Sequence, residues 1–447
     1  MKKIILSTSL LAFAIASGSA TAKVSVEEAN KLGKSLTPMG AQKSGNAAGT
    51  IPAYTGGLKH NANADPLLDI FAHEKPLFVI TNSNLAQYKS NLTAGQLAMF
   101  AKYPGSYKMP IYPTHRTASV PKHIEEKAKK NASRSELTAG GNGLSNFDEV
   151  IPFAIPKNGE EAIWNHIARY RGGNTTANVA TITVEADGSY SSVKTSTKTA
   201  FPQYLDGGMD AKKDDNILFY FLAFNTAPAR VTGNITLVHE TIDQVEQPRK
   251  AWIYNAGQRR VRRAPQVAYD APDSDGLRTI DQVDLFSGAT DRYNWKLVGK
   301  KEIYIPYNSY KLIDQSVKYD QLINAGHLNQ DFARYELHRV WHVEATLKDD
   351  TRHIYEKRDM YLDEDSWQIA LSDQYDSRGQ FWRLLEAHAM QFVTADTLYY
   401  SANAIYDVIA GRYMTELSNE EHKPFSFGSK MKRRDFTTSA IRRSAKR

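Results

Sequence analysis

Four charged residues are expected on strands in the second half of the chain: Arg339, Glu356, Arg358 and Asp373. A guanidinium fork matches the oxygens of a carboxylate, phosphate or ester, so one arginine could anchor the polar head of a ligand. Two positive and two negative charges could equally neutralise one another as an ion-pair network in a core. Paired carboxylates could also do acid–base chemistry, but the arginines beside them favour structural pairing.

Aromatic and aliphatic residues share a face with these charges in the register that we expect. Turns at Asp349-Asp350, Asp363 to Ser366 and Ser377-Arg378 would connect four antiparallel strands, in which opposed residues share a face. One row across the sheet would then hold Trp341, Arg358, Leu371 and Leu384. We therefore predict that an apolar ligand is bound by Arg339, Trp341, Val343, Arg358, Met360, Leu371, Trp382 and Leu384.

The reverse face is polar and is expected to meet solvent. It would carry His338, His342, Tyr355, Lys357, Asp359, Gln368, Ser372 and Gln374. No glutamate stands between the two histidines as it does in zinc proteases, and Asp363-Glu364-Asp365 is most simply a solvated turn. The sequence also lacks a nucleophile elbow, a phosphate-binding loop and a dinucleotide glycine pattern. We expect no enzyme activity, no metal and no cofactor.

The strand that positions this face is the clearest element of the sequence. From Tyr335 to Lys348, apolar and polar residues alternate over 14 positions, which predicts a strand of about 46 Å. A strand this long is typical of a strongly curved antiparallel sheet. The predicted fold is mainly β (α+β): a large curved half-barrel that is closed by helices.

A helix from Glu160 to Tyr170, capped by Asn158, is expected to cover the sheet with an apolar stripe. We include three residues of that stripe, Ile163, Trp164 and Ile167, in the predicted ligand site. Further strands are expected at 179–184, 190–195, 235–241, 251–254, 259–263 and 302–305, and the last of the four strands should end near His388.

The predicted organisation has four parts. Residues 1–22 have a basic start, an apolar run and an A-x-A site at Ala20 to Ala22, which is typical of a cleaved export signal. Residues 23–146 read as an irregular arm with short helices, one of them opened by a capping box at Thr93 to Gln96. Residues 147–420 would form the sheet domain, and residues 421–447 a basic tail.

The charge of the chain is concentrated in that tail. The net charge is +7, and Lys430 to Arg447 alone carries eight basic residues and one acid, so the rest has no positive excess. This distribution argues against a nucleic-acid surface. We expect the tail to be disordered and solubilising, with attraction to anionic lipid or an acidic partner as the alternative.

A second basic stretch is expected as a hairpin from Arg249 to Arg263. Trp252 would pair with Val261 across a turn at 255–258. The arginines are either a solvated sheet edge that deters aggregation or a site for a partner or an anion. The predicted partner-binding residues are Arg259, Arg260, Arg262 and Arg263.

The absence of cysteine excludes disulfides, thiol catalysis and the lipidated cysteine of a lipoprotein. Together with the export signal, it predicts a protein that is free in the periplasm. No later segment of the mature chain is long and apolar enough to span a membrane.

Several motifs resemble a bacterial family known as domain of unknown function 1329. They lie at Leu36 to Ala41, Gly49 to Gly57, Tyr103 to Pro113, Gln258 to Pro265, Trp295 to Glu302, Ile305 to Asn308, Tyr361 to Trp367 and Tyr375 to Gly379, and the closing Phe436 to Arg447 also fits. The resemblance implies a periplasmic fold like that of the lipoprotein carriers LolA and LolB. It also implies a link to resistance-nodulation-division-type permeases and outer-membrane β-barrel proteins.

The sequence therefore predicts a soluble periplasmic carrier or chaperone that shields a lipid, a lipoprotein acyl chain or another apolar molecule. The alternative is a periplasmic adaptor or envelope-stress sensor that binds a permease or a barrel protein and has a filled cavity.

Overall fold

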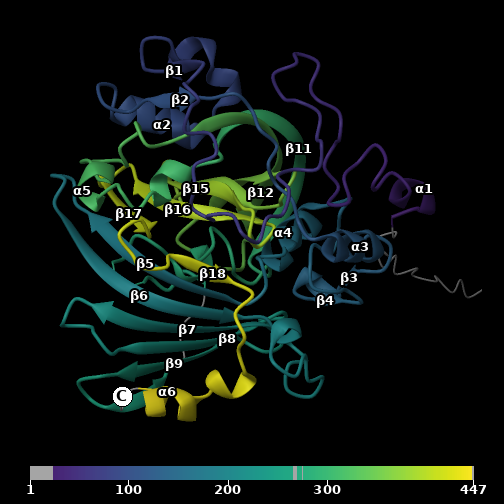
Figure 1. The fold of residues 1–447 in the computed structure, drawn as a ribbon, viewed down its shortest axis with the longest axis vertical. Coiled ribbons are helices and arrows are strands. Elements are labelled where there is room, and N and C mark those ends of the chain that lie inside the picture. Colours follow the sequence, from purple (N-terminus) through teal and green to yellow (C-terminus); the bar gives the residue numbers. More distant parts are fainter. Residues whose placement is uncertain (1–23, 265–268, 274, 445–447) are drawn as a thin grey trace, which may run out of the picture.

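The computed structural model describes residues 24–264, 269–273 and 275–444, so the expected export signal at 1–22 lies outside the described residues. Within them the fold is mostly β, with one large mixed sheet of 16 strands and few helices (Figure 1). β10 ends the sheet on one side and β11 pairs only with β12, so the sheet is not closed. This confirms the predicted fold class.

The strands of the sheet are β1 (Phe78–Ile80), β2 (Met109–Ile111), β5 (Thr175–Val184), β6 (Tyr190–Ala200), β7 (Ile217–Ala227), β8 (Ile235–Thr241), β9 (Lys250–Asn255), β10 (Arg260–Arg263), β11 (Tyr293–Pro306), β12 (Tyr335–Leu347), β13 (Lys357–Asp363), β14 (Ile369–Tyr375), β15 (Phe381–Phe392), β16 (Thr397–Asp407), β17 (Arg412–Leu417) and β18 (Phe425–Phe427). Their order is β1-β2-β12-β13-β14-β15-β16-β17-β5-β6-β7-β8-β9-β10, with β11 beside β12 and β18 beside β5. The pair of β2 and β12 is parallel and the others are antiparallel.

The helices are α1 (Val26–Ala29), α2 (Ala94–Lys102), α3 (Lys122–Asn131), α4 (Gly159–Ala168), α5 (Tyr319–Leu322) and α6 (Thr438–Ser444), and β3 (Glu136–Leu137) with β4 (Leu144–Ser145) forms a small separate ribbon. No helix in these described parts is long and apolar enough to cross a bilayer.

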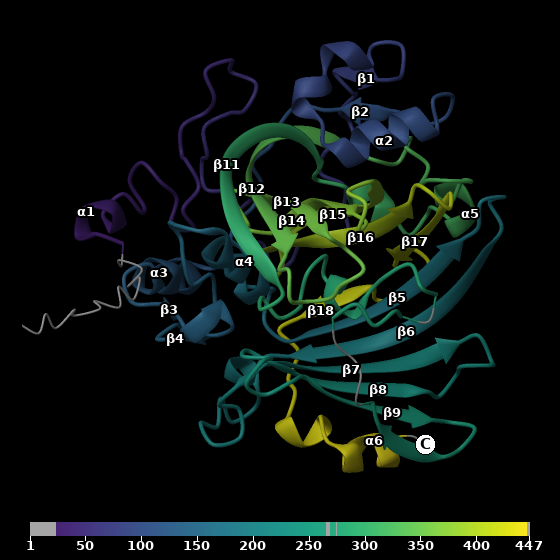
Figure 2. The same cartoon turned by 180° about the vertical axis from the view of Figure 1, so that it is seen from behind.

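The long strand predicted from Tyr335 is β12, and its pairing with β11 makes the longest and most bent ribbon of the fold (Figure 2). The pairing shifts by one residue between Leu297 and Gly299, which is a bulge of the kind that bends a strand. The curved sheet has an inner face, which packs on α4, and an outer face, which packs on α2 and α6.

The inner face is covered by α4 and by the segment 269–292 between β10 and β11, of which 269–273 and 275–292 are described. The Asn158 side chain accepts a hydrogen bond from the Glu161 amide at 2.8 Å, which confirms the predicted cap. Leu285 and Phe286 of the segment lie in the same apolar cluster as Trp164 of α4. The hollow of this half of the sheet is therefore filled by the chain itself.

The outer face of the same strands is covered by the N-terminal arm. The capping box is confirmed, because the Thr93 hydroxyl accepts from the Gln96 amide at 3.2 Å and the Gln96 side chain accepts from the Thr93 amide at 3.0 Å. α2 buries Met99 and Phe100 against the sheet, and β1 and β2 extend it. Both faces of the central strands are thus buried, as in sheets covered on two sides.

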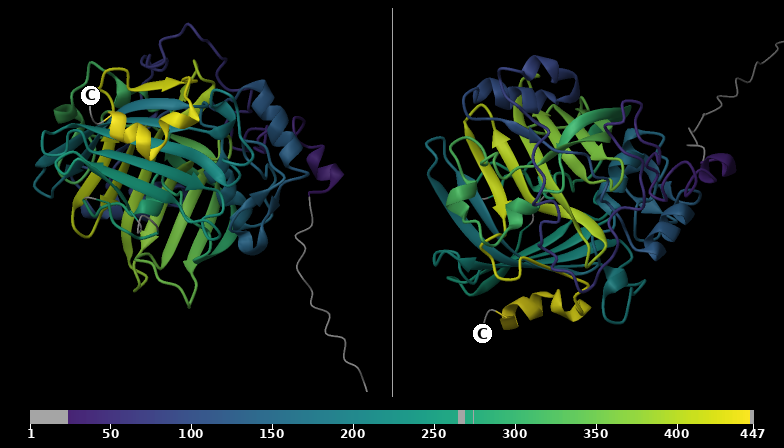
Figure 3. Two further views of the ribbon diagram at one scale, coloured as in Figure 1. Left: turned by 90° about the horizontal axis from the view of Figure 1, so that it is seen from below. Right: turned by 45° about the horizontal axis from the view of Figure 1, so that its top comes forward.

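The basic tail also packs on the sheet, so the prediction of a disordered end is wrong for Lys430 to Ser444. Phe436 stacks on Tyr220 of β7 at a centroid distance of 5.6 Å, and Ile441 of α6 is fully buried beside β8 to β10 (Figure 3). The many basic residues of the tail hid these two apolar anchors.

Strands β7, β16, β17 and β18 were not predicted. β7 reads Ile-Leu-Phe-Tyr-Phe-Leu-Ala-Phe, without the polar alternation of a half-exposed strand. β16 and β17 are also buried on both faces over most of their length. A strand covered on two sides loses the period of two on which the prediction depends.

Candidate ligand-binding site

The register predicted for β12 to β15 is wrong. Trp341 pairs with Leu362, and Val343 with Met360, because residues 348–356 form a loop longer than the predicted two-residue turn. Between β13 and β14 the shift is odd, since Arg358 pairs with Gln374. An odd shift moves every following residue to the other face.

The predicted ligand residues are therefore divided between two faces. Val343, Met360, Ile163, Trp164 and Ile167 pack together on the inner face, whereas Leu371 and Leu384 pack on the outer face with the arm. All seven side chains are buried by the protein's own atoms.

The two predicted tryptophans are half-buried and lie apart. Trp341 stacks on Trp367 with ring centroids 6.0 Å apart, and the ammonium of Lys300 lies 4.7 Å from its ring centroid. Trp382 donates its indole N–H to Asp407 at 2.9 Å. Neither faces a described pocket.

The charges predicted to form one cluster are separated as well. Arg358 pairs with Asp281 of segment 269–292 at 2.6 Å, and Arg339 pairs with Glu364 at 3.4 Å. Burial alone would raise the pKa of Asp281, but Arg358, His353 and Thr279 together outweigh it and hold that pKa well below its usual range. The acid that pairs with Arg358 thus comes from the segment 269–292, which lies outside the four strands of the predicted register.

The polar face that was expected to meet solvent is buried too. His342 bonds to Asp359 at 2.8 Å, and Ser372 and Gln374 are fully enclosed.

His338, Asp363 and Asp365 bring ligand atoms within 4.8 Å of one another, and all three are buried. The prediction that residues 363–365 form a solvated turn is therefore wrong. Arg116 of the arm donates to both carboxylate oxygens of Asp365, at 2.8 and 2.7 Å. Burial and the charge of Asp365 raise the pKa of Asp363 to about 6. The pairing with Arg116 gives this turn a structural explanation as the anchor of the arm.

The arginines of the predicted hairpin, Arg259, Arg260, Arg262 and Arg263, lie exposed at the far edge of the sheet. Val261 pairs with Tyr254 and Trp252 with Arg263, a shift of two residues from the prediction that leaves the faces unchanged. They take no part in the pockets described below.

The described pockets border the loop that follows α4. Tyr170 lines three of them, and we call these neighbouring pockets together the Tyr170 groove. Its main part has a volume of about 340 Å³, at the lower end of the range for small-molecule sites. The lining residues of that part are His60, Pro121, Tyr170, Gly172, Thr394, Ala395, Asp396, Phe427 and Gly428.

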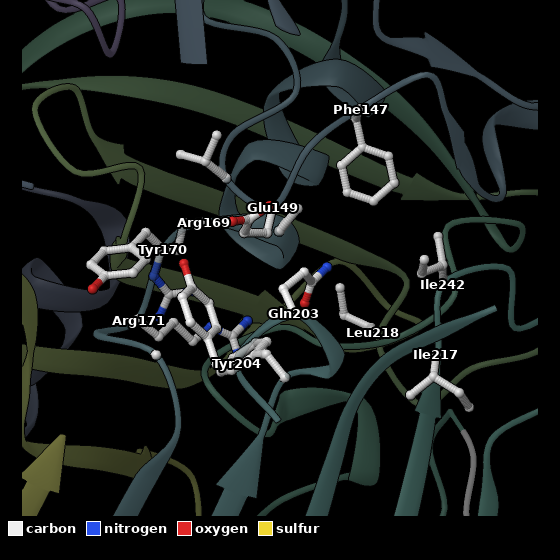
Figure 4. A pocket seen from close by; sticks show the side chains of 14 residues that line it. Phe147, Glu149, Arg169, Tyr170, Arg171, Gln203, Tyr204, Ile217, Leu218 and Ile242 are labelled. Carbon is white, nitrogen blue, oxygen red and sulfur yellow. The ribbon is translucent and has the colours of Figure 1, made fainter. Parts of the chain in front are cut away.

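A narrow extension of the groove runs between α4 and the start of β7, and Figure 4 shows it from close by. Phe147, Leu218 and Ile242 lie at one end, and Tyr170, Arg171 and Tyr204 at the other. Its free space is about 30 Å³, which is room for two or three water molecules. The extension could therefore admit only a head group or the tip of a chain without movement of side chains.

Two buried guanidiniums share one carboxylate beside this extension. Asp284 lies 2.7 Å from Arg169 and 3.1 Å from Arg171. Two other acids of this region are paired elsewhere, Glu240 with Arg249 at 2.7 Å and Glu149 with Lys127, so one positive charge is left in excess. The Nε atoms of Arg169 and Arg171 are buried and have no hydrogen-bond partner among the described residues.

The pKa shifts of Arg171 and His166 agree with a buried, cationic end of the extension. Burial lowers the pKa of Arg171, with Arg169 acting in the same direction and Asp284 opposing them. Burial, then Arg169, lowers the pKa of His166 to about 3, so this histidine is neutral near pH 7. An anionic head group would supply the missing charge.

The sequence contained a signal for this site that was not used. Arg169-Tyr-Arg-Gly-Gly173 follows an apolar helix directly, and Gly172 and Gly173 have φ of 79° and 76°. A Cβ on Gly172 would lie 2.5 Å from the Phe427 ring, so the close approach of this loop to β18 requires glycine.

The model of a protein family described as a protein of unknown function, DUF1329, matches residues 79–442. The chain belongs to the DUF1329 family. An uncharacterised protein of Pseudomonas aeruginosa, PA3922, is 52% identical over 452 residues, covering 100% of this chain and 99% of that protein. The match to the DUF1329 family includes the Tyr170 loop and β18 but not His60.

Two solved structures are similar to this DUF1329 chain in fold. A DUF1329 family protein from Desulfovibrio piger is 14% identical, covers 60% of this chain and 91% of its own, and has a TM-score of 0.40. A LolA superfamily protein from Nitrosomonas europaea, NE2245, is 11% identical, covers 64% and 99%, and has a TM-score of 0.38.

Proposed function

We propose that this DUF1329 protein is a non-catalytic periplasmic carrier that binds an apolar molecule with an anionic head in the Tyr170 groove. The observation that carries the proposal is the guanidinium pair, Arg169 and Arg171, which shares the single carboxylate of Asp284 and lies opposite the apolar end of the pocket. The resemblance to lipoprotein carriers, noted from the sequence motifs, suggests the same class of cargo.

The apolar chain of the ligand would supply most of the affinity, and its anionic head would fix its orientation at the arginines. Each methylene transferred from water contributes about 0.8 kcal/mol, so a chain of roughly 12 would contribute about 10 kcal/mol gross. Association costs several kcal/mol, which leaves an affinity near the micromolar range. A charge-assisted hydrogen bond from a buried arginine adds about 1.5–3 kcal/mol for an acidic head over a neutral one.

The proposed binding residues lie in the Tyr170 groove and not in the row predicted across β12 to β15. Val343, Met360, Leu371 and Leu384 become core residues in this account, and the guanidinium role passes from Arg339 and Arg358 to Arg169 and Arg171. The expected kind of site, an arginine beside an apolar surface, is retained.

A titration of delipidated protein with a dansyl-labelled fatty acid and with its methyl ester tests this proposal. We expect saturable binding of the acid and binding of the ester that is weaker by about ten-fold or more. Leu218→Trp should abolish binding by filling the extension, whereas Val298→Trp, at an exposed site on β11, should leave it unchanged. Equal binding by both variants, or no binding by the wild type, would refute the site.

The filled inner face favours one alternative, an adaptor that binds a permease or an outer-membrane β-barrel protein and carries no lipid. In that case protein purified from its own periplasm would contain no lipid, and pull-downs would recover such a partner even with Leu218→Trp.

A further inference from the structure

The two most basic stretches of the chain, far apart in sequence, form one end of the molecule. The first is the hairpin of β9 and β10, and the second is the tail from Lys430 to Ser444. α6 packs against β8, β9 and β10, which places the tail beside the hairpin (Figure 3). We call this region the basic end.

The tail is held in this place by apolar contacts. Met431, Phe436 and Ile441 are buried in one cluster with Tyr220, Leu237 and other residues of the outer face. The ring of His239 bonds to the Phe436 carbonyl at 2.9 Å. The arrangement is therefore built into the fold and does not depend on charge attraction between the two stretches, which would repel each other.

The cations of the basic end are exposed and are not neutralised by neighbours. The side chains of Arg259, Arg260, Arg262, Arg263, Lys430, Arg434, Arg442 and Arg443 are exposed, and none has an acid within salt-bridge distance in the part of the chain that the structure describes. The sequence has no acidic residue from Arg249 to Ala264 and none after Asp435. The local charge is thus strongly positive although the rest of the protein is near neutral.

The shape of the basic end indicates the kind of partner. Arg260 and Arg262 lie on one face of the edge strand β10, and Arg263 lies on the other. Helix α6 contributes Arg442 and Arg443. No described pocket lies among them. Cations that point in several directions without a groove suit a diffuse array of phosphates better than one shaped protein surface.

We propose that the basic end docks the protein on an anionic lipid surface. Exposed Ile253, at 42% exposure, lies in the same hairpin and would meet the headgroup region. Cations near such a surface each strengthen binding about five-fold, and the attraction falls off within a Debye length of roughly 10 Å. Docking is independent of the Tyr170 groove.

Flotation of delipidated protein with vesicles of equal parts phosphatidylglycerol and phosphatidylcholine tests this proposal. We expect binding in dilute buffer, loss of binding in roughly 0.5 M salt, and no binding to phosphatidylcholine alone. The variant R259Q/R260Q/R262Q/R263Q should bind several hundred-fold more weakly. The variant R442Q/R443Q should bind about 25-fold more weakly.

A control with the same change of charge is K59Q/K75Q/K89Q/K102Q, which removes four exposed lysines from the N-terminal arm. It should bind as the wild type does. Equal loss in both quadruple variants, or no binding of the wild type to anionic vesicles, would overturn the proposal, and the latter would leave an acidic protein as the partner. The flotation uses protein without cargo, so a negative result would count against membrane docking and not against ligand binding in the Tyr170 groove.

Discussion

Asp373 offers a sharp test of how the N-terminal arm is attached. This fully buried carboxylate accepts hydrogen bonds from the Gly95 amide at 3.1 Å and the Thr93 hydroxyl at 3.2 Å, at the start of α2. Burial raises its pKa to about 7, against an ordinary value of 3.8, and the bond from Gly95 opposes this only in part. The folded protein therefore binds this proton more tightly than the unfolded chain does.

The sign of the pH dependence follows from that difference. Between about pH 4 and pH 7 the folded state holds more protons at Asp373, so the free energy of unfolding falls as the pH rises. At about 1.4 kcal/mol per pH unit, the loss reaches about 4 kcal/mol above pH 7. Asp373→Asn mimics the protonated side chain, because its carbonyl can accept from Gly95 and its amide can donate to the Thr93 hydroxyl.

Chemical unfolding of wild type and Asp373→Asn between pH 4.5 and 8, followed by tryptophan fluorescence, measures the difference. We expect equal stability near pH 4.5 and a variant that is more stable by about 4 kcal/mol at pH 8. The difference between the two proteins cancels other groups, such as His166, whose lowered pKa acts in the opposite direction. Exposed Asp349→Asn should give no difference at any pH, and a constant offset for Asp373→Asn would refute the reasoning.

Three further predictions concern packing. Gly95→Ala should cost about 1–3 kcal/mol of unfolding free energy, because its Cβ would lie 2.3 Å from Asp373 and 2.8 Å from Leu384. The control Gly105→Ala, where a Cβ would meet open space, should change stability little. Equal effects of the two substitutions would contradict the docking of α2. Arg358→Met should cost about 3–5 kcal/mol by leaving the buried Asp281 carboxylate without its guanidinium partner, and Arg358→Met with Asp281→Leu should recover most of that in thermal denaturation. Phe436→Ala should cost about 3–5 kcal/mol in the same assay, and no loss would mean that the tail is free.

The sequence predicted those parts of the fold that depend on local patterns. β12 forms where the alternation predicted a strand, although both of its faces are buried, and Asn158 and Thr93 cap their helices as predicted, because each signal lies within a few residues of its element. The curved sheet followed from the length of β12.

The site depended on long-range contacts and could not be predicted in the same way. Three turn lengths had to be right for the row from Trp341 to Leu384. All three registers differ from the prediction, and the odd shift between β13 and β14 divides the row between two faces. The segment 269–292 has no regular pattern, yet it supplies Asp281 and Asp284 to buried arginines. Nothing local in the sequence shows which acid will meet which arginine.

The Tyr170 groove should hold an apolar molecule in the periplasm. Native mass spectrometry of wild type and Leu218→Trp, each purified from its own periplasm, tests this most directly. We predict that the wild type carries an added mass that delipidation removes and that Leu218→Trp carries none. The bare protein mass in both samples, or equal occupancy of both, would contradict the account.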